Sequence, residues 1–262
     1  MRIGFAANPK KDGAIDTRDE LMRCCAAQGV CCALVEDAAA LAGCGALDAL
    51  VVAGGDGSLL RFAAAAAACG VPLLGINLGR IGFLSELSRA MFPAALERLR
   101  AGDYLIERRM MLRCSLNGGE PFYCLNDVLV SRESLSGVAQ IAIDIDGTPV
   151  GTVFCDGVIA ATPTGSTAYT LSAGGPILAS GLDAIAVTPV CPHTLHFRPI
   201  VTAPGAQIRF CAADSGVILA DGTRVSEVRR GDVLLVTGAE RTCSFLRFEK
   251  SDLFRLIREK LS

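Results

Sequence analysis

Lysine is scarce in this chain of 262 residues and occurs only at positions 10, 11, 250 and 260. Basic and acidic side chains nearly balance, 25 against 27, which leaves a formal net charge of −2. Without a basic tract, the sequence does not predict a protein that binds the phosphate backbone of a nucleic acid. With 51% hydrophobic and 20% charged residues, an intrinsically disordered chain is also excluded.

The usual metal-binding cysteine spacings are missing, although the chain has 12 cysteines. No Cys-x-x-Cys occurs, so the common zinc and thioredoxin patterns are absent. Cys191, His193 and His196 offer three metal ligands, but the sequence supplies no fourth, and no side chain is assigned to a metal. Disulfide scaffolds are short and secreted, and the first residues show no signal-peptide pattern. We therefore expect most cysteines to be small buried side chains of a cytoplasmic protein in a reducing compartment.

No apolar run requires a membrane. The longest stretch without charge, residues 62–79, has the length of a spanning helix. It contains Cys69-Gly70-Val71-Pro72 and Asn77, which interrupt such a helix. A helix, a turn and a buried strand explain the stretch better, and no membrane partner is expected.

The first hundred residues alternate strand and helix patterns. Strands are predicted over residues 2–7, 31–35, 47–53 and 71–77, and the last two read as strands that are covered on both faces. Thr17-Arg18-Asp19-Glu20 has the spacing of a capping box and predicts a helix that ends near Gly29. Further helices are predicted over residues 58–69 and 93–100. This rhythm is typical of a parallel, doubly wound, Rossmann-like sheet.

From about residue 103 the segments become short and alternate between apolar and polar residues. Hairpin turns are predicted at Asn117-Gly118, Asp146-Gly147 and Asp221-Gly222. Strands are predicted over residues 141–145 and 233–236, and helices near residues 169–173 and 251–262.

These patterns predict two domains. We expect an α/β nucleotide-binding domain over residues 1–102 and a β-rich, β-sandwich-like, dinucleotide-binding domain over residues 103–239. The C-terminal tail, residues 240–262, is expected to dock on the first domain through its helix. The active site is expected in the cleft between the two halves.

The strongest functional signal is the segment Gly54-Gly55-Asp56-Gly57-Ser58, which follows a buried strand and opens a helix. Such a turn lies where open α/β sheets bind ligands, and glycines let backbone N–H groups reach phosphate oxygens. No Walker lysine and no Gly-x-Gly-x-x-Gly fingerprint occur. Because a carboxylate repels phosphates, Asp56 suggests a second role, as a base toward a hydroxyl or as a metal ligand. The alternative is an Asp N-cap of a helix that starts at Gly57.

Three other segments accompany this loop. Residues 156–169 place four hydroxyl side chains around Pro163, more than one N-cap needs, which favours binding of a sugar, an adenine edge or a diphosphate. Asn126 can present a donor and an acceptor to a base edge, and Asp127 can accept from ribose hydroxyls; a bulge or a strand end is the alternative. Residues 75–83 are glycine-rich and form either a second lip of the cleft or an ordinary strand-to-helix turn.

In their order along the chain, these segments resemble the NAD kinase family. The resemblance rests on Gly54 to Ser58, on Asn126-Asp127, and on Asp156-Gly157 leading into Thr162-Pro163-Thr164-Gly165-Ser166-Thr167-Ala168-Tyr169. Residues 172–177 and 191–195 look like later blocks of the family. The first motif is shared with phosphofructokinases and with lipid kinases of the diacylglycerol and sphingosine type. The block at residues 162–169 is much more specific to NAD kinases.

The resemblance implies an enzyme that transfers a phosphoryl group from ATP, with Mg²⁺ or another divalent cation, to the 2′-hydroxyl of the adenosine ribose of NAD, making NADP. Asp56 would be the general base, and Gly54, Gly55, Gly57 and Ser58 would hold the ATP phosphates. The implied NAD site consists of Asp56, Gly57, Asn126, Asp127, Asp156, Thr164, Thr167, Ala168, Tyr169 and Ser172. Further candidates are Arg61, Phe83, Cys191, His193 and Thr223.

The resemblance also implies a homodimer or homotetramer, because Asp156 and the stretch from Cys191 to His193 would reach NAD across a subunit contact. Many relatives have Glu at position 127, and the shorter Asp127 keeps the charge but changes its reach. Phe154 and Cys155 lack the polar side chains that are often found before Asp156, so no contact with NAD is expected from them.

Two other functions stay open. A kinase with another acceptor, a sugar phosphate or a lipid, would share the glycine loop, but no clear amphipathic basic helix marks a lipid kinase. A non-catalytic nucleotide sensor would keep the fold without turnover, and the intact Asp56 speaks against it.

Overall fold

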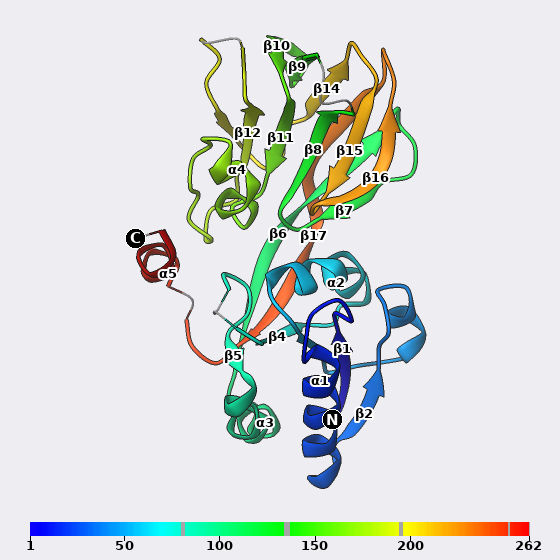
Figure 1. The fold of residues 1–262 in the computed structure, drawn as a ribbon, viewed down its shortest axis with the longest axis vertical. Helices are drawn as coiled ribbons and strands as arrows, with labels where there is room; N and C mark the ends of the chain where they lie inside the picture. Colours follow the sequence, from blue (N-terminus) through cyan, green and yellow to red (C-terminus); the bar gives the residue numbers. More distant parts are fainter. Residues whose placement is uncertain (80–81, 134–136, 194–195, 251, 262) are drawn as a thin grey trace. The chain divides into compact units, whose positions relative to one another are not determined.

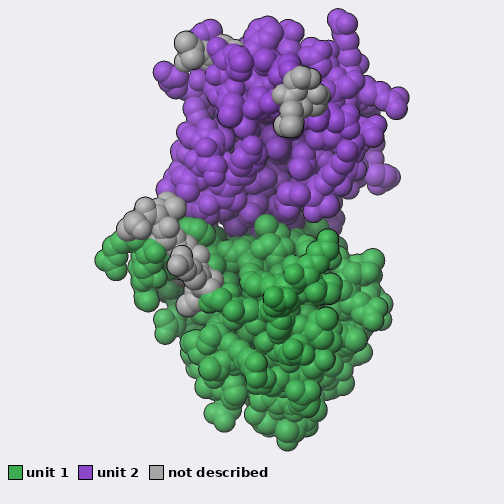
Figure 2. Space-filling model, in the orientation of Figure 1, with its two compact units in different colours: residues 1–109, 243–262 green, residues 110–242 purple. Residues whose placement is uncertain are grey.

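The computed structural model describes residues 1–79, 82–133, 137–193, 196–250 and 252–261. The chain divides into two compact units, which Figures 1 and 2 show. Unit 1 contains residues 1–109 and 243–262, and unit 2 contains residues 110–242. The chain thus leaves unit 1 once and returns to it with its C-terminal segment.

Unit 1 is built on a parallel sheet with the strand order β5-β4-β3-β1-β2. Two of its central strands, β3 and β4, are buried along their whole length, which explains why they read as continuous apolar runs. The end of β17 also joins β4 in parallel, at Phe245 and Leu73. The strands are β1 (Arg2–Ala7), β2 (Cys31–Leu34), β3 (Ala49–Ala53), β4 (Leu73–Asn77), β5 (Leu87–Ser88) and β17 (Val233–Arg247).

Helices cover both faces of this sheet. The helices are α1 (Ala14–Ala27), α2 (Asp56–Cys69), α3 (Phe92–Ala101) and α5 (Leu253–Leu261), with the 3₁₀ turns η1 (Ala40–Cys44) and η2 (Arg89–Met91). α1 and α3 share one core with β1, in which Leu21 and Phe92 join Phe5. α2 covers the other face. Its Leu59 packs so closely on Gly75 of β4 that a methyl group at Gly75 would lie 2.6 Å from Leu59 Cδ1. The predicted doubly wound α/β fold is confirmed.

Glycines in the left-handed region set the helix boundaries. α2 ends at Gly70 (φ 67°) and α3 at Gly102 (φ 72°). Residues 62–79 therefore form a helix, a turn and a strand, as predicted. The capping box at Thr17 is wrong: α1 begins at Ala14 after Gly13 (φ 71°), and the Thr17 N–H donates to the Gly13 carbonyl oxygen within the helix.

Unit 2 is a β sandwich, as expected. One sheet has the order β10-β9-β14-β17, with β6 beside β17 and β7; the other has the order β13-β12-β11-β8-β15-β16. Side chains of both sheets, such as Ile143 and Phe210 of one and Val130 and Val158 of the other, fill one core. The strands are β6 (Leu105–Leu116), β7 (Phe122–Cys124), β8 (Asp127–Arg132), β9 (Ala139–Ile145), β10 (Thr148–Cys155), β11 (Gly157–Ala161), β12 (Ile185–Val190), β13 (Ile200–Thr202), β14 (Ile208–Ala212), β15 (Gly216–Ala220) and β16 (Thr223–Val228).

All three predicted hairpin turns are present. Asn117, Asp146 and Asp221 have φ angles of 51°, 55° and 47°, and the glycine after each also has a positive φ. Two consecutive positive φ angles are what a type I′ turn requires. The turns join β6 to β7, β9 to β10 and β15 to β16.

Two element predictions need correction in length. β17 continues past the predicted residues 233–236 to Arg247. The prediction was too short because polar residues such as Glu240 interrupt the apolar pattern of the strand. The helix near residues 169–173 is only α4 (Tyr169–Ser172), preceded by the 3₁₀ turn η3 (Gly165–Thr167). The predicted C-terminal helix is present as α5 and belongs to unit 1.

The prediction that most cysteines are buried is wrong. All twelve thiols are free, and the buried ones are Cys25, Cys114, Cys124, Cys155 and Cys243. Burial raises the pKa of Cys25 to about 12 and that of Cys155 to about 11, so these two are unreactive at neutral pH. Some of the cysteines that are not buried lie on surface elements such as β2, where Cys31 is exposed.

Among the described residues, no helix is both long and apolar enough to cross a membrane.

Candidate active site

Asp56 is the first residue of α2, immediately after the glycine turn that ends β3. The N-cap of α2 is Gly55, so Asp56 lies inside the first turn of the helix. The Asp56 carboxylate accepts hydrogen bonds from the loop after β4: Oδ2 from Phe83 N at 2.6 Å, and Oδ1 from Leu84 N at 3.2 Å, Ser85 N at 3.1 Å and Ser85 Oγ at 3.1 Å. The alternative that Asp56 serves as the N-cap of α2 is therefore wrong.

Gly82 allows this close approach, because a methyl group there would lie 1.7 Å from Asp56 Oδ1. Within the glycine turn, Gly54 allows a second one, because a methyl group there would lie 2.2 Å from Ser58 Oγ. Of the glycine-rich stretch over residues 75–83, the structure therefore brings Gly82 and Phe83 against Asp56. Arg80 and Ile81 lie outside the described residues.

Two cations lie near the glycine turn. A methyl group at Gly55 would lie 3.2 Å from Lys11 Nζ, and Arg61 Nη1 donates to Asn8 Oδ1 at 3.3 Å. Arg61 was predicted from the resemblance, whereas Lys11 was missed. The signal for Lys11 was its place just after the first strand, because the carboxyl ends of parallel strands meet at one edge of the sheet.

In unit 2, Asn126 and Asp127 are both buried at the start of β8. The Asp221 carboxylate accepts from the backbone N–H groups of Leu125, Asn126 and Asp127, at 2.8, 2.7 and 3.3 Å. The side-chain oxygen of Asn126 is buried and has no hydrogen-bond partner among the described residues, so it can accept a hydrogen bond from a ligand. Asp221 was predicted only as a turn residue, and its role in fixing the backbone of this segment was missed.

The loop at residues 162–169 packs directly on this segment. Thr162 N donates to the Asn126 carbonyl oxygen at 2.9 Å, and Thr162 Oγ1 donates to the Leu125 carbonyl oxygen at 2.6 Å. Ser166 Oγ donates to the Pro163 carbonyl oxygen at 2.6 Å and accepts from Leu178 N at 2.9 Å. Two of the four hydroxyls, those of Thr162 and Ser166, thus serve the fold, and the number of hydroxyls in this loop overstates how many can bind a ligand.

The other predicted residues of this loop differ in exposure. Thr164 is buried, Thr167 and Ala168 are half-buried, and Tyr169 and Ser172 are exposed. Thr167 Oγ1 donates to the Thr164 carbonyl oxygen at 3.1 Å. The structure therefore brings Thr164 and Thr167 together and leaves the phenol ring of Tyr169 open to solvent.

Asp156 lies beside the predicted segment from Cys191 to His193. Asp156 N donates to the Val190 carbonyl oxygen, and His193 N donates to the Phe154 carbonyl oxygen at 2.7 Å. Asp156 Oδ1 accepts from Arg132 Nε at 2.8 Å, an ion pair that the sequence did not predict. Cys191 and His193 are exposed, as is Thr223 at the start of β16, whereas Thr194 and Leu195 lie outside the described residues.

Comparison with known proteins decides the family. A family model of the ATP-NAD kinase N-terminal domain matches residues 39–104, and one of the C-terminal domain matches residues 125–248. An NAD kinase of Moorella thermoacetica is 37% identical over 277 residues, which cover 100% of this chain and 89% of the relative. The chain belongs to the NAD kinase family.

Other members of the NAD kinase family agree with this assignment. An NAD kinase of Clostridium botulinum is 40% identical over 83% of this chain and 79% of its own length. The crystal structure of an NAD kinase from Archaeoglobus fulgidus in complex with ATP is 28% identical, with a TM-score of 0.83 over 98% of this chain and 99% of that one. The fold expected of the family is therefore present throughout the chain.

The buried carboxylate of Asp127 gives this family member a distinctive electrostatic feature. Burial raises the pKa of Asp127 to about 7, and the nearby charge of Asp221 adds to the shift. Burial also raises the pKa of Asp221, opposed by its three backbone donors. At neutral pH, Asp127 is thus poised between its neutral and charged forms.

This feature predicts a pH-dependent stability. Because folded Asp127 holds its proton to a higher pH than the unfolded chain does, the free energy of unfolding should fall as pH rises from about 4 to about 7. Asp127→Asn should remove this loss and be more stable than wild type at pH 8, by on the order of 4 kcal/mol, because the pKa rises from 3.8 to about 7 and each pKa unit is worth about 1.4 kcal/mol. Urea unfolding at pH 5.5, 6.5 and 8 measures it.

The control for this prediction is Asp214→Asn, which changes an exposed carboxylate of the same unit. It should follow the wild-type pH dependence. If Asp127→Asn does the same, the raised pKa of Asp127 is contradicted.

Proposed function

We propose that this chain transfers the γ-phosphoryl group of ATP to the 2′-hydroxyl of the adenosine ribose of NAD, and so makes NADP. The observation that carries the proposal is the Asp56 carboxylate, fixed by four hydrogen-bond donors at the N-terminus of α2 in a member of the NAD kinase family. Neither a phosphate-binding loop alone nor a dinucleotide-binding fold alone needs a carboxylate held there.

Unit 1 would bind the phosphates of ATP. The first N–H groups of α2 have no partner within the helix and carry partial positive charge, and Gly54, Gly55 and Gly57 let an anion approach them. A methyl group at Gly57 would meet nothing within 4 Å, so this side of the loop is open. Lys11 would add a positive charge beside Gly55, as lysines do at many phosphate sites.

Mg²⁺ would come with ATP, held mainly by phosphate oxygens and water. Among the residues that the structure describes, no three His, Cys, Asp or Glu side chains cluster so as to hold a metal ion by themselves. A single carboxylate beside a phosphate loop suits a cation of this kind, which keeps several waters and uses few protein ligands. When bound, the cation would neutralise charge on the phosphates during transfer.

Asp56 would accept the proton of the attacking 2′-hydroxyl. Oδ1 already accepts three hydrogen bonds from the loop, and Oδ2 accepts one, from Phe83 N. Oδ2 therefore keeps a lone pair for the ribose hydroxyl. Phosphoryl transfer passes through a loose transition state, so a carboxylate suffices as the base if it takes the proton late and the hydroxyl is aligned.

Unit 2 would bind the adenosine half of NAD. The buried, unpartnered Asn126 oxygen can accept from the adenine amino group, and Asp127 can accept from a ribose hydroxyl. Thr164, Thr167, Ala168, Tyr169 and Ser172 would line the rest of the dinucleotide site, and Asp156 would reach NAD across a subunit contact. Arg61, Phe83, Cys191, His193 and Thr223 are the further candidates.

The proposal includes an assembly and a location. The exposed Cys191 and His193 would meet NAD bound to a neighbouring copy, in a homodimer or homotetramer, whose subunit number native mass spectrometry measures. The twelve free thiols fit the cytoplasm, a reducing compartment.

The test is NADP formation by the purified chain from NAD and Mg·ATP, measured with an NADP-specific dehydrogenase. Polyphosphate and other nucleoside triphosphates are tried as donors, and lipids and sugar phosphates as acceptors. NADP formation supports the proposal. Phosphorylation of a lipid or sugar alone, or NAD binding without turnover under every donor, overturns it in favour of another kinase or of a sensor.

A further inference from the structure

The loop that holds Asp56 contributes one side chain to this contact as well as its backbone. Ser85 Oγ accepts from Gly82 N and donates to Asp56 Oδ1, both at 3.1 Å. It thereby closes the loop on itself and ties it to the carboxylate. Ser85 is 3% exposed, so water competes little for these bonds.

A buried arginine holds the same loop from the other side. Arg247 Nη1 donates to the Leu84 carbonyl oxygen at 2.8 Å, while Leu84 N donates to Asp56 Oδ1. Arg247 Nε also donates to Glu107 Oε2 at 2.7 Å, and Nη1 lies 3.7 Å from Glu86 Oε2. Arg247 is only 5% exposed, and a single residue, Leu84, connects it to the catalytic candidate.

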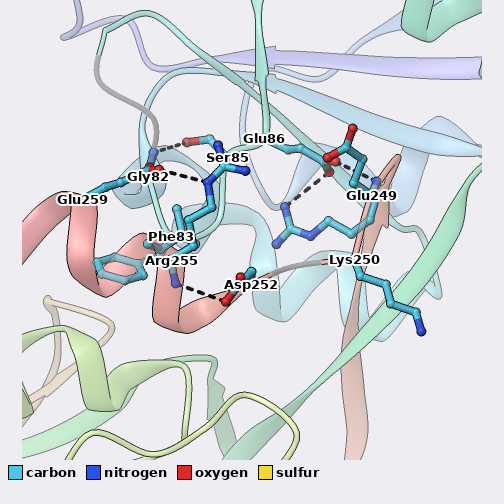
Figure 3. A pocket seen from close by; sticks show the side chains of 11 residues that line it. Gly82, Phe83, Ser85, Glu86, Glu249, Lys250, Asp252, Arg255 and Glu259 are labelled. Atoms are coloured by element: carbon cyan, nitrogen blue, oxygen red, sulfur yellow. Dashed lines mark hydrogen bonds and ion pairs between the residues drawn. The ribbon is translucent and has the colours of Figure 1, made fainter.

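Packing alone does not fix the loop on this side. Gly82, Phe83, Ser85 and Glu86 line a cavity of about 170 Å³, together with Arg247 and residues of α5 (Figure 3). Close-packed neighbours would otherwise hold such a loop. Polar contacts hold it here: Arg247 Nη1 donates to the Leu84 carbonyl oxygen, and Glu86 Oε1 accepts from Phe248 N at 2.9 Å and from Glu249 N at 3.2 Å.

We propose that Ser85 and Arg247 are positioning residues that fix the Asp56 carboxylate for proton transfer from the ribose hydroxyl. This inference rests on the proposed function. Ser85 orients Oδ1 and leaves Oδ2 toward the substrate, and Arg247 keeps Leu84, with its N–H, at Oδ1. Such alignment is most of what an enzyme contributes to phosphoryl transfer.

The first test is Ser85→Ala, which removes the hydroxyl and leaves the three backbone donors. We expect kcat to fall about tenfold, with the dissociation constant for NAD changed less than about twofold, because the base and not the binding site is affected. Ser115→Ala, which changes another buried serine, is the matched control and should keep the wild-type kcat and NAD dissociation constant.

The second test asks whether Ser85 acts through Asp56. In an Asp56→Asn background, Ser85→Ala should change kcat less than about twofold. Equal losses in both backgrounds would overturn the proposal, as would an unchanged kcat for Ser85→Ala in the wild-type background. Absence of NADP from the wild-type enzyme would instead count against the proposed function, so the two failures are distinguishable.

The third test is Arg247→Lys, which keeps the buried charge but cannot bind Glu107 and the Leu84 carbonyl together. We expect kcat to fall about tenfold with the NAD dissociation constant unchanged. Arg98→Lys is the control, because Arg98 donates to the Phe248 carbonyl oxygen at 3.1 Å and does not reach the loop. An unchanged kcat for the folded Arg247→Lys variant would remove Arg247 from the proposal.

Discussion

Asp56→Asn should lower kcat for NADP formation by about 10²- to 10⁴-fold, the usual contribution of a general base. The amide nitrogen cannot accept the hydroxyl proton. It also places a donor where the carboxylate accepted from either Phe83 N or the Leu84–Ser85 pair. At least one backbone N–H then loses its acceptor, so the free energy of unfolding of the variant should be lower by about 1–3 kcal/mol.

Initial rates at saturating NAD and Mg·ATP measure the first effect, and urea unfolding measures the second. Asp37→Asn is a suitable control, since Asp37 also accepts a backbone hydrogen bond in unit 1, from Ala40 N at 2.8 Å, but outside the glycine turn. It should keep the wild-type rate. Full activity of Asp56→Asn would contradict its role as the base and leave Asp56 as an anchor for the loop.

The sequence predicted the place of Asp56 because the relevant signals are local. A buried apolar strand, three glycines and an alanine-rich helix are all readable within about twenty residues of the chain. The partners of its carboxylate are not readable in this way. They are backbone N–H groups of Phe83, Leu84 and Ser85, and any residue type except proline supplies such a group.

Asp221 is a second residue whose hydrogen-bond partners cannot be read from the local sequence. The dipeptide Asp221-Gly222 predicts a type I′ turn, and this turn is present. That local role is a sufficient explanation for an aspartate, so nothing in the sequence indicates that its carboxylate binds three N–H groups around Asn126. Only the pairing of β8 with β15 brings the two segments together.

The hydroxyl-rich block was interpreted from composition, and composition does not give side-chain direction. Thr162 and Ser166 point into the fold and bond backbone atoms of Leu125, Pro163 and Leu178. Thr164 and Thr167 come from the same block and line the proposed NAD site, although Thr167 Oγ1 also bonds the Thr164 carbonyl oxygen. A sequence can therefore locate such a block, while the division of its residues between folding and binding depends on tertiary packing.

Gly165→Ala should reduce kcat/KM for NAD by about 10²-fold, although it adds only one methyl group. The methyl carbon would lie 2.1 Å from the Asn126 carbonyl oxygen and 2.4 Å from its carbonyl carbon. Because the clashing atoms belong to the backbone of Asn126, they cannot rotate away as the end of a flexible side chain can. The loop must therefore move away from Asn126. A displacement of about 1 Å in a positioning segment costs on the order of 10²-fold in rate.

The same displacement should appear in stability. Moving the loop strains the bonds from Thr162 N and Thr162 Oγ1 to the Asn126 and Leu125 carbonyl oxygens, and overpacking of this kind costs about 1–3 kcal/mol. Gly181→Ala is the matched control, because a methyl group there would meet nothing within 4 Å. If Gly165→Ala loses stability but keeps the wild-type KM for NAD, this loop packs on Asn126 without forming part of the dinucleotide site. If the free energy of unfolding and kcat/KM for NAD both fall, as we expect, Gly165 is what lets two segments of unit 2 act as one binding surface.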